Sequence, residues 1–371
     1  MSLSRKIRSS RALALKDRPI YAHVGVTHRC NMHCRMCSIP ARANQATEAT
    51  PERFAVAAKE IADLGCLAVS LGGGEPFMRQ DLPKVVEVFA KQGLRVRVLT
   101  NGATASAQMI ADIASAGAKD ISISLDSLDE KIQADLEDRK GLLQKKFESI
   151  SNVQAHFPGG GIHILNAVVT PQTLSGLINV ARFAKAIGFY AGFIPVHIEK
   201  GHHFFTGDAS LRFGAEDRDR LREAYRNLIG FRGQGGIVNS KKFLDNSRKY
   251  LLGEPVDWRC RAGALYLSIG PDARIAACHE FEDSDSVEPA GFAKRFLFED
   301  WPRRAKENRS GCSKCFRPCW AEIDYLATDI GAFFGSLSMR LLGTQGKPAC
   351  LEAEELAGLA ASIVSGAEAG P

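Results

Sequence analysis

Apolar and polar residues follow two alternating patterns along the first two thirds of the chain. Short runs rich in β-branched residues are followed by longer stretches in which apolar residues recur every three or four positions. The first pattern is typical of buried strands and the second of amphipathic helices, so their alternation predicts parallel βα units. We predict strands at 21–27, 67–71, 95–100, 120–125, 162–169 and 190–196.

The stretch after residue 50 shows how the helix ends are recognised. Thr50 is a favoured N-cap residue, Pro51 suits the first helical position, and Gly65 ends the pattern. The apolar face of this helix contains Phe54, Ala57, Ile61 and Leu64. Further helices are predicted at 82–91 and 105–116.

Beyond about residue 210 the βα alternation ends. A glycine-rich segment at 230–236 indicates a connecting loop, and a basic helical stretch follows at 240–252. Residues 265–269 and 274–277 then predict a β-hairpin, because a Gly-Pro-Asp-Ala turn separates them. The sequence therefore predicts a large α/β unit followed by a smaller one of different design.

Composition narrows the class of protein. The 371 residues are 45% hydrophobic and 24% charged, which is ordinary for a globular protein of one large and one smaller domain. The net charge of +6 permits an acidic partner, but no Lys/Arg run is long enough to indicate nucleic-acid binding. Neither a signal peptide nor a membrane-spanning run is present. Ten cysteines without a secretion signal indicate metal or redox use in the cytoplasm.

Three of these cysteines lie within eight residues. Cys30, Cys34 and Cys37 place three thiolates on a short loop directly after the first predicted strand. A 4Fe–4S cluster that only carries electrons takes four thiolates, so three leave one iron open to bind another molecule. The alternative is a zinc site, for which His28 or His33 would have to supply the fourth ligand.

A glycine-rich motif ends the second predicted strand. Gly73, Gly74, Glu75 and Pro76 follow an apolar run. Glycines at a strand end allow close approach of the backbone to a ligand, and the carboxylate of Glu75 can receive an amine.

Together, the cysteine triple and the Gly73–Pro76 motif resemble the radical S-adenosylmethionine (SAM) superfamily over roughly residues 20–210. The resemblance implies a partial (β/α)6 TIM-like barrel and a 4Fe–4S cluster whose open iron chelates the amino and carboxylate groups of SAM. Reductive cleavage of SAM would then yield a 5′-deoxyadenosyl radical that abstracts a substrate hydrogen, with reduced flavodoxin or ferredoxin as electron donor. Where the family usually has an aromatic residue this chain has Met36, which is flexible enough to pack on adenine.

The carboxyl ends of later strands supply further candidate SAM contacts, since chemistry in parallel barrels lies there. Alternation points Ser122, Ser124 and Asp126 to one face, where buried polar groups need partners. The family uses the end of this strand for the ribose hydroxyls, which nominates Ser124 and Asp126, although a purely structural network is the alternative. Asn166 is a further candidate, and Val196 belongs to an apolar segment that would pack against adenine.

A second cysteine group is formed by Cys260, Cys278, Cys312, Cys315 and Cys319. The predicted hairpin returns its ends to one place, which brings Cys260 and Cys278 together, and Cys312 with Cys315 forms a chelating pair. Spacing alone leaves zinc and a second iron–sulfur cluster equally open.

A hairpin flanked by cysteines and followed by Cys-x-x-Cys resembles the twitch domain, the short form of the SPASM domain, over roughly 255–325. The resemblance implies an auxiliary 4Fe–4S cluster on Cys260, Cys278, Cys312 and Cys315, with Cys319 competing for a place. The cysteine left over would be a thiol able to donate a hydrogen atom. The expected division is an N-terminal extension (1–19), a radical SAM core barrel (20–225), a twitch/SPASM-like domain (226–345) and a C-terminal tail (346–371).

The auxiliary cluster favours net oxidation, in which it accepts an electron from the substrate radical. Such a reaction needs a base, for which we nominate Glu199, His202, His203 and Glu280. A polar loop cluster without catalytic function is the alternative for the first three.

Two functions follow from these expectations. The first is a radical SAM oxidoreductase acting on a small molecule, and the alternative is a maturase that modifies a ribosomally made peptide or protein. Peptide-modifying members commonly carry a leader-binding domain ahead of the barrel, whereas about twenty residues precede the first strand here. This difference favours a small-molecule substrate, although a separate leader-binding partner could replace the missing domain in a peptide-modifying enzyme. A non-catalytic metal protein is a third reading, disfavoured by the intact cysteine triple and Glu75.

Overall fold

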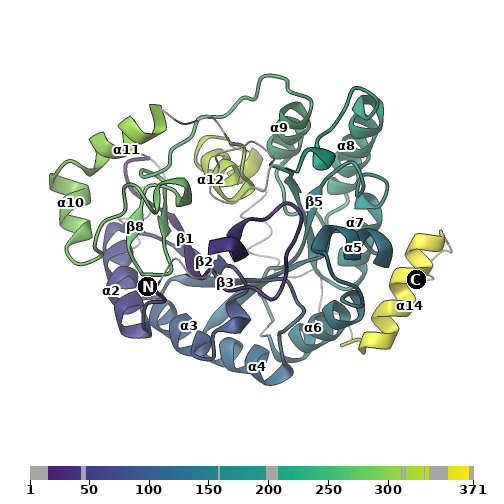
Figure 1. Ribbon diagram of the computed structural model, residues 1–371, viewed down its shortest axis with the longest axis horizontal. Coiled ribbons are helices and arrows are strands. Elements are labelled where there is room, and N and C mark those ends of the chain that lie inside the picture. Colours follow the sequence, from purple (N-terminus) through teal and green to yellow (C-terminus); the bar gives the residue numbers. More distant parts are fainter. Residues whose placement is uncertain are drawn as a thin grey trace.

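The computed structural model describes residues 16–42, 47–157, 159–197, 208–310, 312, 315–329, 331–333 and 350–366. Six parallel strands lie side by side in chain order and form an open barrel (Figure 1). They are β1 (Tyr21–Thr27), β2 (Ala68–Gly73), β3 (Arg95–Thr100), β4 (Ala118–Ser124), β5 (His163–Val169) and β6 (Tyr190–Pro195). The predicted α/β fold with a partial (β/α)6 barrel is confirmed, and each predicted strand is found within two residues of its expected ends.

Helices form the outer layer around these strands (Figure 1). They are α2 (Pro51–Leu64), α3 (Leu82–Lys91), α4 (Ala107–Ser115), α5 (Glu130–Glu137), α6 (Leu143–His156), α7 (Leu177–Ala186), α8 (Arg218–Arg232) and α9 (Lys241–Leu251). α2 begins and ends as predicted: Pro51 is its first residue, and Gly65 adopts a left-handed conformation with φ of 106° at its C-cap.

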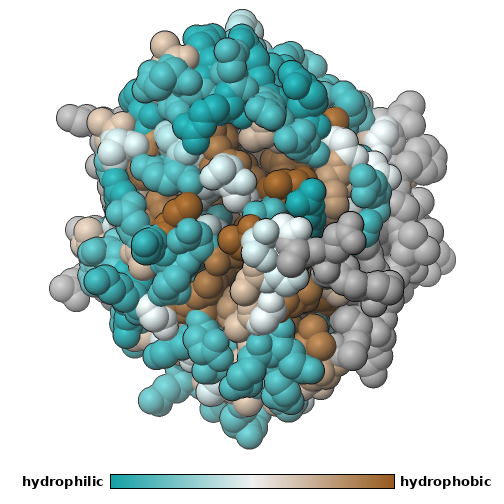
Figure 2. All heavy atoms as spheres, turned by 90° about the vertical axis from the view of Figure 1, so that its right-hand side faces the viewer, coloured by the Kyte–Doolittle hydropathy of each residue, from teal (hydrophilic) through white to brown (hydrophobic). Residues whose placement is uncertain are grey.

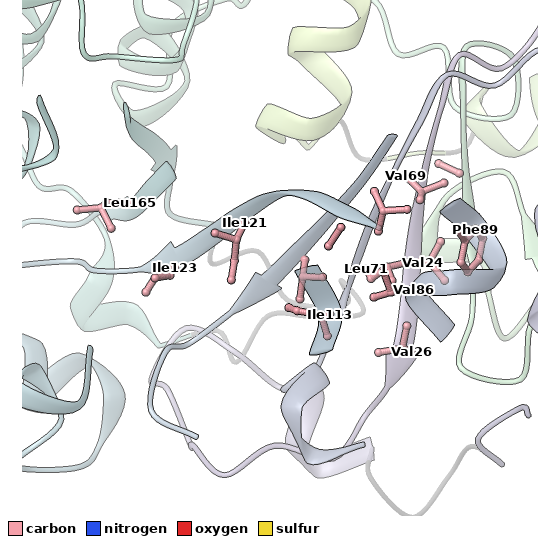
Figure 3. Close-up of a cluster of buried hydrophobic side chains, with 14 of the residues drawn as sticks. Val24, Val26, Val69, Leu71, Val86, Phe89, Ile113, Ile121, Ile123 and Leu165 are labelled. Atoms are coloured by element: carbon pink, nitrogen blue, oxygen red, sulfur yellow. The ribbon is translucent and has the colours of Figure 1, made fainter. Parts of the chain in front are cut away.

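The main core lies between the strands and these helices. Alternate residues of β1 and β2, among them Val24 and Leu71, point outward and pack against Val86 and Phe89 of α3 (Figure 3). Each such side chain contributes roughly 1.5–3 kcal/mol on burial. The intervening residues point to the inside of the barrel, so the polar positions of the same strands face the lumen.

The predicted hairpin consists of β7 (Tyr266–Ile269) and β8 (Ile275–Ala276), which pair antiparallel. The hairpin is part of the barrel sheet, because β7 also pairs parallel with β1, from Tyr21 opposite Tyr266 to Val24 opposite Ile269. The sheet order is therefore β6-β5-β4-β3-β2-β1-β7-β8. The domain boundary near residue 225 stays a prediction, and the sheet extends across it.

Four further α-helices follow the hairpin: α10 (Phe292–Phe298), α11 (Trp301–Ser310), α12 (Pro318–Thr328) and α14 (Ala353–Ser365). α12 lies inside the ring of outer helices, whereas α14 lies on the rim beside α6 and α7 (Figure 1). Apolar residues at helical spacing also predict a helix over 326–342, most of which falls outside the described residues.

Figure 2 shows the side of the molecule that carries α14, where hydrophilic residues surround a hollow lined by apolar ones. In the described part of the chain, none of the helices combines the length and apolarity that a membrane crossing requires.

Candidate functional site

The cysteine loop lies at the carboxyl edge of the sheet, directly after β1. Cys30, Cys34 and Cys37 are all half-buried, and the N–H of Cys37 donates to the carbonyl of Cys34 at 2.9 Å. Arg29 holds the start of the loop through two hydrogen bonds to Glu48, at 2.7 and 2.8 Å. The loop that carries the three cysteines therefore lies at the end of the barrel where chemistry is found in parallel barrels.

The glycine motif packs on the backbone of this loop. Gly74 N–H donates to the carbonyl of Thr27 (2.7 Å), and Glu75 N–H donates to that of Arg29 (2.8 Å). A Cβ at Gly73, whose φ is 111°, would lie 2.3 Å from the Thr27 oxygen, and one at Gly74 would lie 2.2 Å from the Arg29 oxygen. The glycines were expected to admit a ligand; in the structure the close approach is to the cysteine loop itself.

Glu75 lies fully buried behind the loop. Its carboxylate accepts hydrogen bonds from the N–H of Phe77 (3.1 Å), the hydroxyl of Thr100 (2.8 Å) and the N–H of Asn101 (2.7 Å). Burial raises the pKa of Glu75 to about 7, against the opposing effect of these hydrogen bonds. Pro76, also buried, begins a short 3-10 helix beside it. The carboxylate thus ties the end of β3 to the motif, and a contact with the amine of SAM stays a prediction.

Asn101 is a site residue that the sequence analysis missed. Its amide nitrogen donates to the side-chain oxygen of Asn31 at 2.8 Å and lies 3.9 Å from the Cys30 sulfur. The sequence signal that could have identified Asn101 was its position directly after β3. In the structure its side-chain oxygen accepts the N–H of Ala103 at 2.9 Å. Asn101 is both a turn residue and a neighbour of the first cysteine.

The polar candidates on β4 and β5 lie together. Ser124 and Asn166 stand opposite each other in the sheet. Asp126 follows β4 and accepts the N–H of Val168 at 2.7 Å, which joins the ends of β4 and β5. Burial, with the nearby charge of Glu137, raises the pKa of Asp126 to about 6.

The two residues expected near adenine also share one location. Met36 of the cysteine loop packs against the apolar cluster of Leu136, Val196 and Leu211. Val196 directly follows β6, so this cluster lies at the carboxyl edge with the cysteines.

A buried ion pair lies beneath this edge and was not predicted. Lys146 Nζ is 2.8 Å from Glu137 Oε1, and both side chains are almost fully buried. Lys146 also donates to the carbonyls of Asn101 (2.7 Å) and Ser124 (2.8 Å), so one ammonium ties together the ends of β3 and β4. The apolar pattern of α6 gives no sign that a lysine lies on its buried face.

The buried carboxylate and thiols at this edge suit a cationic ligand and iron. Glu137 Oε2 is buried without a hydrogen-bond partner among the described residues. Burial, followed by the charge of Glu137, raises the pKa of the Cys34 thiol, and burial raises that of Cys37 to about 11. SAM carries a sulfonium and an ammonium group, and iron converts thiols to thiolates, so both would supply missing positive charge. No described group of His, Cys, Asp or Glu could hold a single metal ion; a cluster instead spreads its thiolates over several irons.

Four cysteines of the second group are gathered around another cavity. Cys260, Cys312 and Cys315 line a space of 670 Å³. Cys278 is buried beside it, and burial together with the charge of Cys315 raises its pKa well above the usual range. Burial also raises the pKa of Cys315 to about 12. The set matches the four ligands expected for the auxiliary cluster, which stay a prediction.

Cys319 does not line this cavity, although it packs on the same buried cluster as Cys260 and Cys278. It lines a cavity of 330 Å³ in the barrel lumen, between the strands and α12. Polar side chains surround that cavity: His23, Ser70, Arg97, Ser122, Asn166 and Glu322. Two atoms there, Ser122 Oγ and Arg97 Nε, have no hydrogen-bond partner in the described chain. Such a pocket favours a ligand with polar groups.

Of the four catalytic candidates, Glu280 alone lies among the described residues. Glu280 forms an ion pair with Arg317 at 2.8 Å. Glu199, His202 and His203 lie outside the described residues. Glu322, which the sequence analysis did not nominate, faces the lumen, and burial raises its pKa to about 7.

Comparison with known proteins agrees with this geometry. Residues 24–184 match the sequence family described as "Radical SAM superfamily". The chain is 26% identical over 348 residues to the PqqA peptide cyclase of Ruegeria pomeroyi, covering 90% of this chain and 86% of that protein. It is 25% identical over 276 residues to the PqqA peptide cyclase of Gluconobacter oxydans, 73% of either chain.

Solved structures share the fold. SuiB of Streptococcus suis bound to the precursor peptide SuiA superposes with a TM-score of 0.62 at 16% identity, over 84% of this chain and 71% of SuiB. anSMEcpe with bound AdoMet and the Cp18Cys peptide gives a TM-score of 0.58 at 14% identity, over 93% and 99% of the two chains. From the open barrel, the cysteine loop at its edge and the family match, we conclude that residues 24–184 form a domain of the radical SAM superfamily.

Proposed function

We propose that this protein is a radical SAM enzyme that modifies a peptide, with an auxiliary iron–sulfur cluster in its C-terminal part. The observation that carries the proposal is the match to PqqA peptide cyclases, which spans 348 residues and so extends well beyond the barrel. The small-molecule oxidoreductase expected from the sequence has less support, because the named relatives act on a peptide.

Cys30, Cys34 and Cys37 would hold the catalytic cluster, and Met36, Ser124, Asn166 and Val196 lie where SAM would contact the edge. When bound, cluster and SAM supply a radical that abstracts a hydrogen atom from the substrate. Cys260, Cys278, Cys312 and Cys315 would hold the auxiliary cluster.

The lumen cavity would receive the side chain to be modified. Arg97 and Ser122 offer donors to its polar end, and residues of α12 line its other side. Glu322 would take up the proton that net oxidation releases, since a pKa of about 7 suits a base at neutral pH. Glu199, His202 and His203 remain further candidates.

The experiment is an anaerobic assay of the reconstituted protein with SAM and a reductant. The probes are the PqqA peptide and the short peptides encoded beside the gene of this protein. We expect 5′-deoxyadenosine together with a mass change in one peptide, and neither product from the Cys30/Cys34/Cys37→Ala variant. If every peptide keeps its mass while small hydroxylated compounds are oxidised, the small-molecule reading replaces the proposal.

A further inference from the structure

A stack of aromatic side chains separates the second cysteine cavity from the barrel lumen. The Tyr266 hydroxyl lies 3.2 Å from the Cys260 sulfur. The Tyr266 ring stacks on Trp320 of α12, with centroids 4.4 Å apart and an interplanar angle of 11°. Trp320 in turn meets Tyr21 and His23 edge-on, at 6.0 and 6.5 Å.

The lumen end of this stack reaches the proposed substrate pocket. Tyr21 and His23 both line the 330 Å³ cavity, as does Cys319, the residue before Trp320. Trp320 and Tyr266 themselves are fully buried. A continuous series of ring contacts therefore runs from a proposed cluster ligand to the pocket.

Two observations go beyond ordinary core packing. The Tyr266 oxygen accepts the N–H of Arg261 at 2.9 Å, so its own hydrogen is available for the Cys260 sulfur, which as an iron-bound thiolate can only accept. In addition, Trp320 Nε1 has no hydrogen-bond partner among the described residues, although buried indoles usually have one. The equally buried Trp301 follows the usual rule and donates to the Gly263 carbonyl at 2.9 Å.

We propose that Trp320 and Tyr266 form the path by which an electron passes from the substrate in the lumen to the auxiliary cluster. This inference rests on the proposed function. The substrate radical loses one electron and one proton: the proton goes to a base in the lumen, and the electron reduces the cluster by one unit. A one-electron carrier protein, such as an oxidised flavodoxin, then restores the cluster. Tyr266 acts through the proposed ligand Cys260, and Trp320 acts through Tyr266, so both are positioning residues.

The first test needs no substrate. Tyr266→Phe keeps the ring stack and removes only the hydroxyl, so we expect normal iron content and a lower midpoint potential of the auxiliary cluster. The reason is that a hydrogen bond to a ligand sulfur stabilises the more negative reduced cluster. An EPR-monitored redox titration measures this potential, with Tyr250→Phe as the control, since Tyr250 lines the same cavity. An unchanged potential in Tyr266→Phe would overturn the assignment.

The second test follows turnover with the peptide identified above. In Trp320→Leu we expect several-fold less reduced auxiliary cluster in freeze-quenched EPR samples and several-fold more 5′-deoxyadenosine per product. Trp320→Phe keeps an aromatic ring, so it should lose less coupling than Trp320→Leu but more than Trp301→Phe, which should match the wild type. If Trp320→Leu forms as little 5′-deoxyadenosine per product as the wild type, the proposal is wrong. If Trp320→Leu fails to fold, a Trp320→Phe variant with less coupling than Trp301→Phe supports the path, and equal coupling counts against it.

Failure of the proposed function is distinguishable from failure of the path. If no peptide is modified, the titration of Tyr266→Phe still reports whether Tyr266 touches a cluster ligand. If a peptide is modified and the titration shows no shift, the function stands and the path is rejected.

Discussion

The cysteine loop at 30–37 and the cysteine set at 260–315 differ in how much of the chain each needs. The loop follows one strand and is held by backbone contacts with Gly74 and Glu75. The second set comes from three segments and depends on a hairpin that joins the sheet beside β1. One added atom against the loop would shift all three of its cysteines, whereas in the second set it would shift one segment of three.

The largest expected effect is on metal content. Two four-iron clusters predict about eight irons per chain. The Cys30/Cys34/Cys37→Ala variant should keep about four and lose all SAM cleavage, and Cys260/Cys278→Ala should keep the other four. Elemental analysis of reconstituted protein measures both.

Cys319→Ser is the matched control, because Cys319 lines the lumen instead of the second cavity. It should leave the iron count unchanged. A loss of iron there would make Cys319 a ligand, and zinc with four irons would return the second set to a structural metal site.

The next effect concerns the glycine motif. Gly74→Ala would place a methyl group 2.2 Å from the Arg29 oxygen, so the cysteine loop must shift. We expect loss of the catalytic cluster with the auxiliary cluster retained, seen as about half the iron and one remaining EPR signal.

Gly25→Ala provides the control on β1, since its added Cβ would meet its nearest atoms at 3.7 Å, an ordinary contact. It should bind iron like the wild type. If Gly74→Ala does so too, the loop is more adaptable than its close contacts indicate.

A smaller effect is expected at the buried ion pair. Lys146→Met leaves the charge of Glu137 buried and unpaired, which should lower the free energy of unfolding by about 3–5 kcal/mol. The double variant Lys146→Met/Glu137→Met should recover much of this loss. Urea unfolding measures both, with Lys59→Met as control because its pair with Asp63 is exposed. Equal stability of the single and double variants would contradict the argument.

The smallest effect is a pH dependence at Asp126. Its pKa is about 6 in the folded protein and about 3.9 when unfolded. Between these values the folded state holds a proton that the unfolded state has released, so the free energy of unfolding falls as pH rises from about 4 to about 6. Asp126→Asn should flatten this part of the stability curve, and an unchanged slope would show that Asp126 ionises normally.

The fold around the first cysteine loop was predictable because its information is local. The six strands, the edge that carries Cys30–Cys37 and the glycine motif all follow from periodicity and spacing. The residues that were missed depend on tertiary contacts. Lys146 sits on an amphipathic helix like any surface lysine until its neighbours are known, and Asn101 could be read only as a turn.

The part of the chain that carries the second cysteine set was harder to predict, because its arrangement also depends on tertiary contacts. Cysteine spacing suggested a compact unit, and the hairpin within it is present. No pattern in the sequence predicts that β7 pairs with β1, because parallel pairing between distant strands leaves no short-range signal. The position of Glu322 in the lumen also depends on α12 lying inside the ring of helices.

The pairing of β7 with β1 has a consequence for solubility. Without the C-terminal part, β1 would be the terminal strand of the sheet, with a row of unpaired N–H and C=O groups. Such edges recruit strands from other molecules and lead to aggregation. The segment that carries the second cysteine set therefore also shields the barrel from edge-to-edge association, and a barrel cut off before it would be prone to aggregate.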